Sequence, residues 1–210
     1  MTTAKKSPKP HHRADRTRDK IIKAAKHLFA RHGFAGTSTL KITERAKVPH
    51  SLLFHHFTNK QNLWLAVKAF VVEKENKKTD ILPDTSLPLT EFISELTQRL
   101  FHFYQADPEL TRMLNWQRME SHQQKGLGIT LSTESRRWID AFAYYQQQGQ
   151  IDSTIKPEYI VTMIGGIIFS AAFDPNVFLQ DSASMQAYLN FCSEHIALML
   201  SVKNKESLGN

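Results

Sequence analysis

The fold of this chain is decided by residues 17–65, which read TRDKIIKAAKHLFARHGFAGTSTLKITERAKVPHSLLFHHFTNKQNLWL. Apolar residues recur at helical spacing over 15–32, which predicts a first helix with a narrow apolar face. Gly33 follows directly, and glycine is the residue most often found just past a helix C-terminus. We therefore expect the first helix to end there.

Two short helices are predicted next. The first has three N-cap candidates, Thr37, Ser38 and Thr39. Its apolar residues, which we expect to face inward, are Leu40, Ile42 and Ala46. The second is expected over about 49–57, because proline fits the first turn of a helix and moves the preceding residue out of helical conformation. Two short helices joined by a tight turn form a helix-turn-helix.

The remainder of the chain is predicted to be helical as well. A capping box formed by Thr58 and Gln61 should start a helix that runs to about Lys78. Further helices follow from apolar spacing and from start and stop signals. They are marked by 92–103, Pro108, 138–149, Pro157, and Asp181 or Ser182. The predicted fold class is all-α with about nine helices, and no strand pattern stands out.

The charge of the chain is unevenly distributed. The net charge is +7, and residues 1–60 hold 14 Lys and Arg against 3 acids, whereas 61–210 hold 13 bases and 17 acids. A polyanion is the expected partner of the N-terminal part, and nucleic acid and an anionic membrane surface both qualify. The alternative is a charged tail that only aids solubility.

The cysteine content and the hydropathy restrict the protein class. Cys192 is the single cysteine, so no intrachain disulfide can form, which fits a reducing cytoplasm. The most apolar run, 159–173, is shorter than the roughly 20 residues needed to span a bilayer. We expect a buried helix there and no membrane partner.

Five segments within 17–65 carry a family resemblance. They are TRDKIIKAAKHLFARHGF, TS (37–38), ITERA (42–46), LFHHF (53–57) and NKQNL (59–63). The chain resembles the DNA-binding domain of the TetR family of bacterial regulators. The resemblance implies a cytoplasmic, nucleoid-associated homodimer that binds a palindromic operator, and a repressor released from DNA by a small-molecule effector. It also implies phosphate contacts by Thr37 or Ser38, by His55 and by Lys60.

The start of the expected recognition helix points to base contacts, because such a helix presents its first residues to base edges in the major groove. These residues are Pro49, His50, Ser51 and Leu52. His50 and Ser51 can donate or accept hydrogen bonds at base edges, and Leu52 can contact a thymine methyl group. The expected basic arm, Arg13, Arg16 and Arg18, would track the backbone or enter a minor groove.

The chain departs from the pattern of the resembling family at three positions. Lys47 and Ser51 replace usual glycines, and a non-glycine residue with positive φ is uncommon at Lys47. Phe54 replaces the usual tyrosine and has no hydroxyl to donate to a phosphate. We keep Phe54 among the expected DNA-facing residues, without a polar contact.

The second half of the chain is rich in aromatic residues interrupted by polar ones, which is typical of small-molecule sites as well as of a core. We expect domains over 15–62 (helix-turn-helix) and 63–205 (helical, ligand-binding and dimerising), after a disordered basic tail over 1–14. The predicted ligand-binding residues are Trp116, Met119, Phe142 and Phe169. Gly165 and Gly166 indicate a close helix approach, either to a second copy or inside the monomer.

The sequence bears on three other functions. An enzyme is not expected, because the nucleophile elbow, the phosphate-binding loop and the dinucleotide fingerprint are missing from the sequence. We accordingly expect no catalytic residue, no metal and no cofactor. A DNA-binding architectural or division-linked protein without a ligand would share the first 60 residues. A membrane-surface role is the third alternative.

Overall fold

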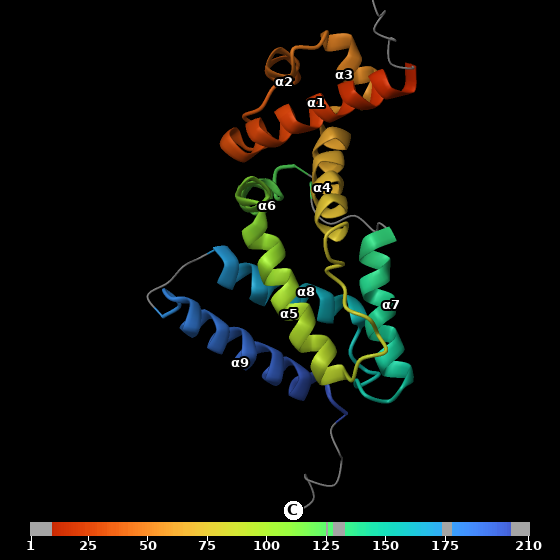
Figure 1. Cartoon of the computed structure of the whole chain (residues 1–210), viewed down its shortest axis with the longest axis vertical. Coiled ribbons are helices and arrows are strands. Elements are labelled where there is room, and N and C mark those ends of the chain that lie inside the picture. The colour runs from red at the N-terminus through yellow and green to blue at the C-terminus, as the bar shows by residue number, and fades with distance from the viewer. Residues whose placement is uncertain (1–9, 125, 128–132, 174–177, 203–210) are drawn as a thin grey trace, which may run out of the picture. The chain divides into compact units, whose positions relative to one another are not determined.

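The computed structural model describes residues 10–124, 126–127, 133–173 and 178–202, and the regular elements in these ranges are helices (Figure 1). The nine helices of this described part are α1 (Pro10–His32), α2 (Thr39–Ala46), α3 (His50–His56), α4 (Lys60–Asn76), α5 (Leu89–Ala106), α6 (Pro108–Glu120), α7 (Thr133–Gln147), α8 (Pro157–Phe173) and α9 (Ser182–Leu200). This confirms the predicted all-α class.

The first helix starts earlier than the apolar pattern indicated. α1 begins at Pro10, inside the 1–14 segment expected to be a disordered tail, while 1–9 lie outside the described residues. Proline is well suited to the first turn of a helix, where its missing N–H has no intrahelical partner to lose. The apolar pattern missed this start because polar residues continue a helix without marking it.

The caps of α4 and α9 differ in how well the sequence predicted them. Asn59, not Thr58, caps α4, because its Oδ1 accepts a hydrogen bond from the N–H of Asn62 at 2.7 Å. The Thr58 prediction was one residue early, since the N-cap must directly precede the first helical residue. At α9 the cap is Asp181, one of the two candidates, and its side chain accepts from the N–H of Ser184 at 2.7 Å in a capping box.

The inward face of α2 also differs from the prediction. Ile42, Thr43 and Ala46 are buried, whereas Leu40 is 55% exposed. Leu40 lies two residues before Ile42, which at about 100° per residue places it on the opposite side of the helix. A helix of this length offers only one buried stripe, and Leu40 is not on it.

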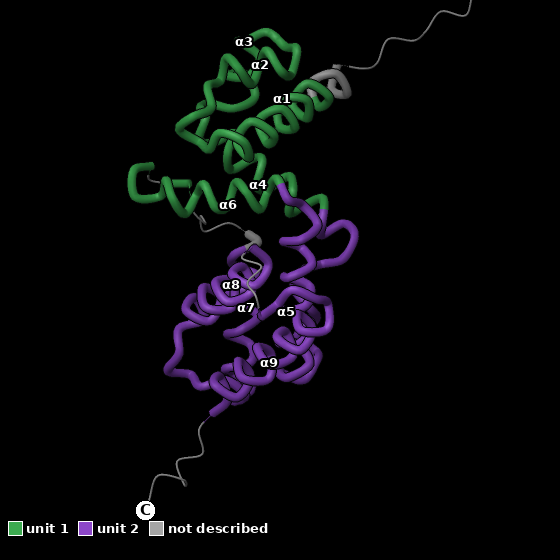
Figure 2. Tube along the Cα trace, turned by 90° about the vertical axis from the view of Figure 1, so that its left-hand side faces the viewer, with its two compact units in different colours: residues 1–74, 109–128 green, residues 75–108, 129–210 purple. Residues whose placement is uncertain are grey.

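The chain divides into two compact units (Figure 2). The first comprises residues 1–74 and 109–128, that is α1 to α4 with α6. Its core includes Ile21, Phe29, Leu53 and Trp64, and α2 and α3 both pack on α1. Met113 of α6 is fully buried in the same core. Burial of such side chains stabilises the unit by roughly 1.5–3 kcal/mol each.

The second unit comprises residues 75–108 and 129–210, with α5, α7, α8 and α9. α5 contacts α8 and α9, and α7 packs against α8. Phe92 packs edge-on against Phe142, with ring centroids 5.9 Å apart, and also against Tyr145. The Tyr145 hydroxyl donates a hydrogen bond to the carbonyl oxygen of Leu87 at 2.8 Å. In the described ranges no helix combines the length and the hydropathy that crossing a bilayer requires.

Candidate nucleic-acid interface

The start of α2 is set by a side-chain cap. Ser38 has extended backbone angles (φ −95°, ψ 149°), and its Oγ accepts a hydrogen bond from the N–H of Lys41 at 3.2 Å. This satisfies one of the N–H groups that a helix start leaves without a partner. Among the three N-cap candidates, Ser38 is therefore the one that caps α2.

The turn between α2 and α3 depends on a left-handed residue at Lys47 (φ 54°, ψ 50°). The N–H of Lys47 donates to the Glu44 carbonyl and that of Val48 donates to the Thr43 carbonyl, both at 3.1 Å. This is the Schellman pattern, in which the left-handed position usually holds glycine. The expected positive φ at Lys47 is thus confirmed, and a lysine side chain sits at a backbone position that L residues adopt at a cost.

α3 has one buried side and one exposed side. Leu53 is fully buried, and Phe57, just after the helix, is 5% exposed. Arg18 of α1 lies over the Phe57 ring, 5.6 Å from its centroid. The exposed positions are Pro49, His50, Ser51, Phe54 and His55, while Leu52 is half-buried. The predicted base-contacting positions thus gather at the start of α3 and along its outer side.

His50 is held at the start of α3 by two neighbours. Its Nε2 lies 3.0 Å from Oγ1 of Thr39, the first residue of α2. Its ring packs edge-on against that of Phe54, with centroids 5.1 Å apart. Phe54 is 47% exposed, so its outward ring surface offers an apolar contact in place of the hydroxyl that it lacks. The Thr39–His50 contact links the starts of the two helices.

Histidines at the end of α3 differ in environment. His55 is exposed, whereas His56 is half-buried and its ring lies 5.2 Å from that of His55. Burial, followed by the nearby His55 and Arg18, lowers the pKa of His56 below its usual value. His56 is therefore biased toward the neutral form, and His55 is the better placed of the two to meet a phosphate.

Thr37 does not occupy the position that the resemblance implied. It is 1% exposed, and its Oγ1 lies 2.7 Å from the carbonyl oxygen of Gly33 and 3.2 Å from that of Leu28. The hydroxyl donates inward, so of the two residues that the resemblance offered for a phosphate contact, Ser38 is the one with an exposed side chain. The preference of threonine for helix starts hid this role, because the sequence does not tell which of two adjacent hydroxyls points outward.

Lys60, also expected on a phosphate, is half-buried at the start of α4. Its Nζ donates to the carbonyl oxygens of Phe34 at 2.8 Å and Thr37 at 3.0 Å, and lies 4.3 Å from the centroid of the Phe34 ring. Burial lowers the pKa of Lys60, and the negative charge of Glu120 opposes that shift. Two of the three ammonium donors thus hold the turn before α2, which leaves one for a phosphate.

The expected basic arm is partly described. Arg16 and Arg18 are exposed on α1, and the side chain of Arg13 lies outside the described residues. No cluster of three or more metal-ligating side chains is present among the residues that the structure describes.

The four predicted ligand-binding residues fall in two units. Trp116 and Met119 belong to the first, where the Trp116 indole N–H donates to the carbonyl oxygen of Ala30 at 3.3 Å and Met119 is 61% exposed. Phe142 and Phe169 belong to the second and are buried. Phe169 stacks on Phe173 with ring centroids 3.9 Å apart. Each unit thus holds two of the four residues, and neither unit holds all of them.

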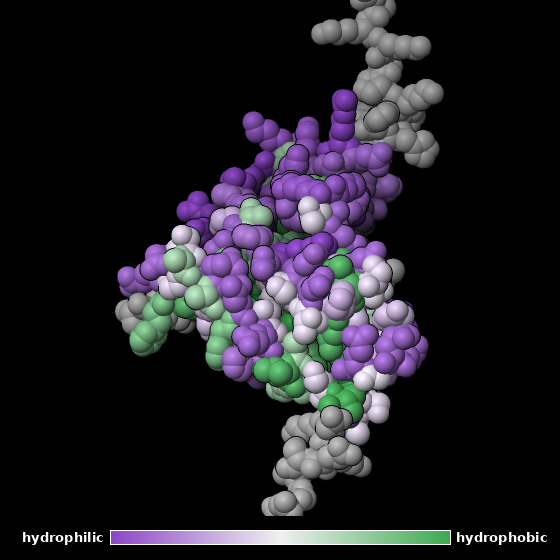
Figure 3. Space-filling view, turned by 60° about the horizontal axis from the view of Figure 1, so that its bottom comes forward, coloured by the Kyte–Doolittle hydropathy of each residue, from purple (hydrophilic) through white to green (hydrophobic). Residues whose placement is uncertain are grey.

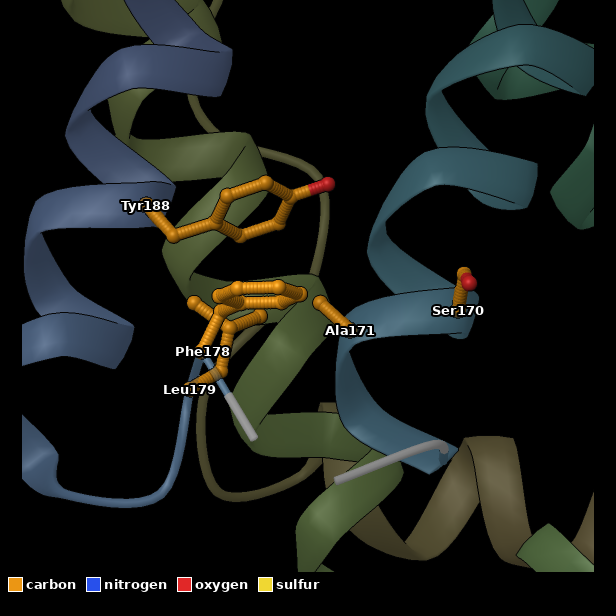
Figure 4. A pocket seen from close by; sticks show the side chains of 5 residues that line it. All are labelled: Ser170, Ala171, Phe178, Leu179 and Tyr188. Atoms are coloured by element: carbon orange, nitrogen blue, oxygen red, sulfur yellow. The ribbon is translucent and has the colours of Figure 1, made fainter. Parts of the chain in front are cut away.

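Two hollows of the second unit are lined by other residues. One, of about 190 Å³, lies between α8 and α9 and is lined by Ser170, Ala171, Phe178, Leu179 and Tyr188 (Figure 4). The rings of Tyr188 and Phe178 lie one above the other, with the Tyr188 hydroxyl directed toward α8. The second, of about 300 Å³, lies near the start of α5 and the end of α9. Ligand sites typically measure about 300–1,000 Å³, so the first is small for an effector.

Family models of known proteins match a segment in each half of the chain. The family model described as "Bacterial regulatory proteins, tetR family" matches residues 21–67. A second family model, described as "Tetracyclin repressor-like, C-terminal domain", matches residues 93–190. The chain belongs to the TetR family. The resemblance of residues 17–65 is thereby confirmed, and the family match extends into the second half of the chain.

Individual relatives of this TetR-family chain are distant. The transcriptional repressor NicS of Pseudomonas putida is 29% identical over 48% of this chain and 48% of its own length. The repressor SCO4008 of Streptomyces coelicolor is 33% identical over 50% of each chain. This chain thus spans about half the length of the curated relatives that it matches first.

Solved structures share the fold over nearly the whole chain. A tetR family transcription regulator from Shewanella sp. PV-4 has a TM-score of 0.63 at 19% identity and covers 89% of this chain and 99% of its own. A TetR variant from Acinetobacter baumannii in complex with minocycline has a TM-score of 0.59 at 17% identity and covers 85% and 93%. At these identities the likeness establishes the fold alone.

Proposed function

We propose that the protein is a sequence-specific DNA-binding transcription regulator whose α3 enters the major groove. The observation that carries the proposal is the two-sided character of α3, which buries Leu53 and exposes His50, Ser51 and Phe54 at one end and along one side. Side chains of this kind can donate, accept and make apolar contact at base edges. The excess of basic residues in 1–60 supplies the attraction to phosphates.

Phosphate contacts are assigned to residues that the fold leaves accessible. We propose Ser38 at the start of α2, His55 on the exposed side of α3 and the third ammonium donor of Lys60. Pro49 and Leu52 would flank the bases read by His50 and Ser51. The phosphate contacts position the protein on the DNA, and the base contacts read its sequence.

We further propose that the protein acts as a homodimer through α8 and α9. Their exposed apolar residues include Tyr159, Phe191, Leu198 and Met199. In Figure 3 apolar residues gather on the surface of this unit near the described C-terminal end. Apart from its own turn of helix, a Cβ added at Gly165 or Gly166 would meet no atom within 4 Å in the described part of the chain, so packing there does not require either glycine. The close approach of a second copy to α8 would require glycine at these two positions.

The second unit is proposed to bind a small-molecule effector that releases the protein from its operator. Support comes from the match to a tetracycline-repressor-like domain and from the similar fold of the Acinetobacter baumannii TetR variant, which was solved in complex with minocycline. Phe142 and Phe169 remain proposed ligand-binding residues, because each lies in an aromatic cluster of this unit. Trp116 and Met119, which lie in the first unit, also remain proposed ligand-binding residues. The effector can shift DNA binding only by its differential affinity for two states.

Repression is the proposed sign of regulation, because the relatives NicS and SCO4008 are repressors. Access to an operator requires a cytoplasmic, nucleoid-associated protein, and we propose that location. No catalytic activity is part of the proposal.

Selection of duplexes from a random library by the full-length protein tests the proposal. We expect a palindromic consensus, bound more weakly as salt increases because bound phosphates release counterions. Ser51→Ala and His50→Ala should relax preference at particular base pairs. Recovery of no consensus, with equal binding to all duplexes, would favour the architectural alternative and contradict a regulator.

A further inference from the structure

α6 is built into the DNA-binding unit although many residues separate it from α1 in the sequence. Met113 is fully buried in the core of that unit. The Trp116 indole N–H donates to the carbonyl oxygen of Ala30 at 3.3 Å, and Glu109 lies 2.8 Å from the His27 ring. α6 therefore follows the C-terminal half of α1.

The last turn of α6 reaches the turn that connects α1 to α2. Oε2 of Glu120 accepts a hydrogen bond from the backbone N–H of Ala35 at 3.0 Å. Gly33 has φ +70°, and a Cβ at this position would lie 2.3 Å from Oε1 of Glu120 and 2.9 Å from the Trp116 ring. Only glycine fits both the conformation and the space, so the turn and the end of α6 are in close contact.

Lys60 holds the same turn from α4. Its ammonium group donates to the carbonyl oxygens of Phe34 and Thr37, and the charge of Glu120 favours its protonated form. An acid on the N–H of Ala35 and a cation on two carbonyls thus fix three of the four residues 34–37. Charge-assisted hydrogen bonds of this kind are stronger than neutral ones.

The position of this turn sets the position of α2. Ser38, the N-cap, follows Thr37 directly, and Thr39 is the first residue of α2. Oγ1 of Thr39 lies 3.0 Å from Nε2 of His50, the first residue of α3. The end of α6 is therefore linked to His50 by the Ala35 contact, by the chain from 35 to 39 and by the Thr39 contact.

We propose that Glu120 is a positioning residue for DNA recognition: by accepting the Ala35 N–H, it fixes the turn that places α2 and, through Thr39, the start of α3. This inference rests on the proposed DNA-binding function. The proposal predicts a change in DNA affinity opposite to the change that the loss of the charge alone would cause. Glu120 is an acid in a unit proposed to bind a polyanion, so its charge alone opposes binding, and its removal should strengthen binding if charge were its only effect.

The test compares three variants of the full-length protein on a selected duplex and on a scrambled duplex of equal length. We expect E120A to bind the selected duplex about tenfold more weakly, as loss of a charge-assisted hydrogen bond would cause, and to bind the scrambled duplex at least as tightly as the wild type. E120Q keeps an acceptor for the Ala35 N–H without the charge and should therefore lose less of the selected affinity than E120A. E109A, the control, removes the same charge together with the His27 contact at the other end of α6, and should retain the selected affinity because the Ala35 contact is untouched.

Three results separate the possible failures. Unchanged or tighter binding of E120A to the selected duplex, or an equal loss in E120Q, would overturn the positioning role. Failure of the wild type to bind either duplex would contradict the proposed function instead. Should E120A not fold, the amide proton of Ala35 decides: in the wild type its NMR shift should follow the ionisation of a carboxyl group in acid, and in E120Q it should not. An identical pH response in the two proteins would overturn the contact.

Discussion

Removal of the Thr37 hydroxyl should destabilise the DNA-binding unit. Thr37 is 1% exposed, and its Oγ1 lies 2.7 Å from the Gly33 carbonyl oxygen and 3.2 Å from that of Leu28. Thr37→Val keeps the shape and leaves the Gly33 carbonyl without this donor. A buried acceptor that loses its partner costs about 1–3 kcal/mol, so we expect the free energy of unfolding to fall by about 2 kcal/mol. Thr37→Ser, which removes one buried methyl group, should cost about 1 kcal/mol.

Urea unfolding followed by tryptophan fluorescence measures both losses. Trp64 and Trp116 lie in the first unit and Trp138 in the second, so a Trp138→Phe background reports on the first unit alone. Protein concentration must be constant, because dimerisation contributes to apparent stability. Thr37→Val with wild-type stability and weakened DNA binding would refute the reasoning and return Thr37 to a phosphate contact.

Three further predictions follow from single residues. Lys47→Gly should raise the free energy of unfolding by about 0.5–1 kcal/mol, because glycine adopts the left-handed conformation without a Cβ clash; unchanged or lower stability in urea would show no strain there. Burial lowers the pKa of Lys68 from 10.5 to about 8, so the unfolded chain binds more protons between these values and stability should increase with pH by at most about 1.4 kcal/mol per unit. Lys68→Met should abolish this rise in urea titrations, and an equal slope in both proteins would contradict it. Leu198→Asp should give a monomer in sedimentation, while the equally drastic control Leu40→Asp should stay dimeric; a dimeric Leu198→Asp would exclude this part of α9 from the interface.

The helix-turn-helix could be predicted because its signals are local. Gly33 and Pro49 mark a helix end and a helix start by their own backbone preferences. The αL conformation of Lys47 was also foreseeable from its position in the turn. Local signals of this kind need no knowledge of what the helices pack against.

Orientation and long-range packing could not be read in the same way. Thr37 and Ser38 are adjacent hydroxyl residues, and only the packing of α1 against the turn decides that the first donates inward and the second caps α2. Trp116 is an aromatic residue of the kind that lines ligand sites, yet its indole N–H donates to a backbone carbonyl of α1. Glu120 carried no signal at all, because its partner Ala35 is 85 residues away.

The most direct test of the central claim is a hydroxyl-radical footprint of the full-length protein on its selected duplex. If α3 of each protomer occupies a major groove, two protected regions should appear symmetrically, separated by about one helical turn of 34–36 Å or a multiple of it. Ser51→Ala should leave the two protected stretches of backbone in place, while the protein concentration needed to protect them rises. A single asymmetric region, or uniform protection without a preferred site, would contradict the account.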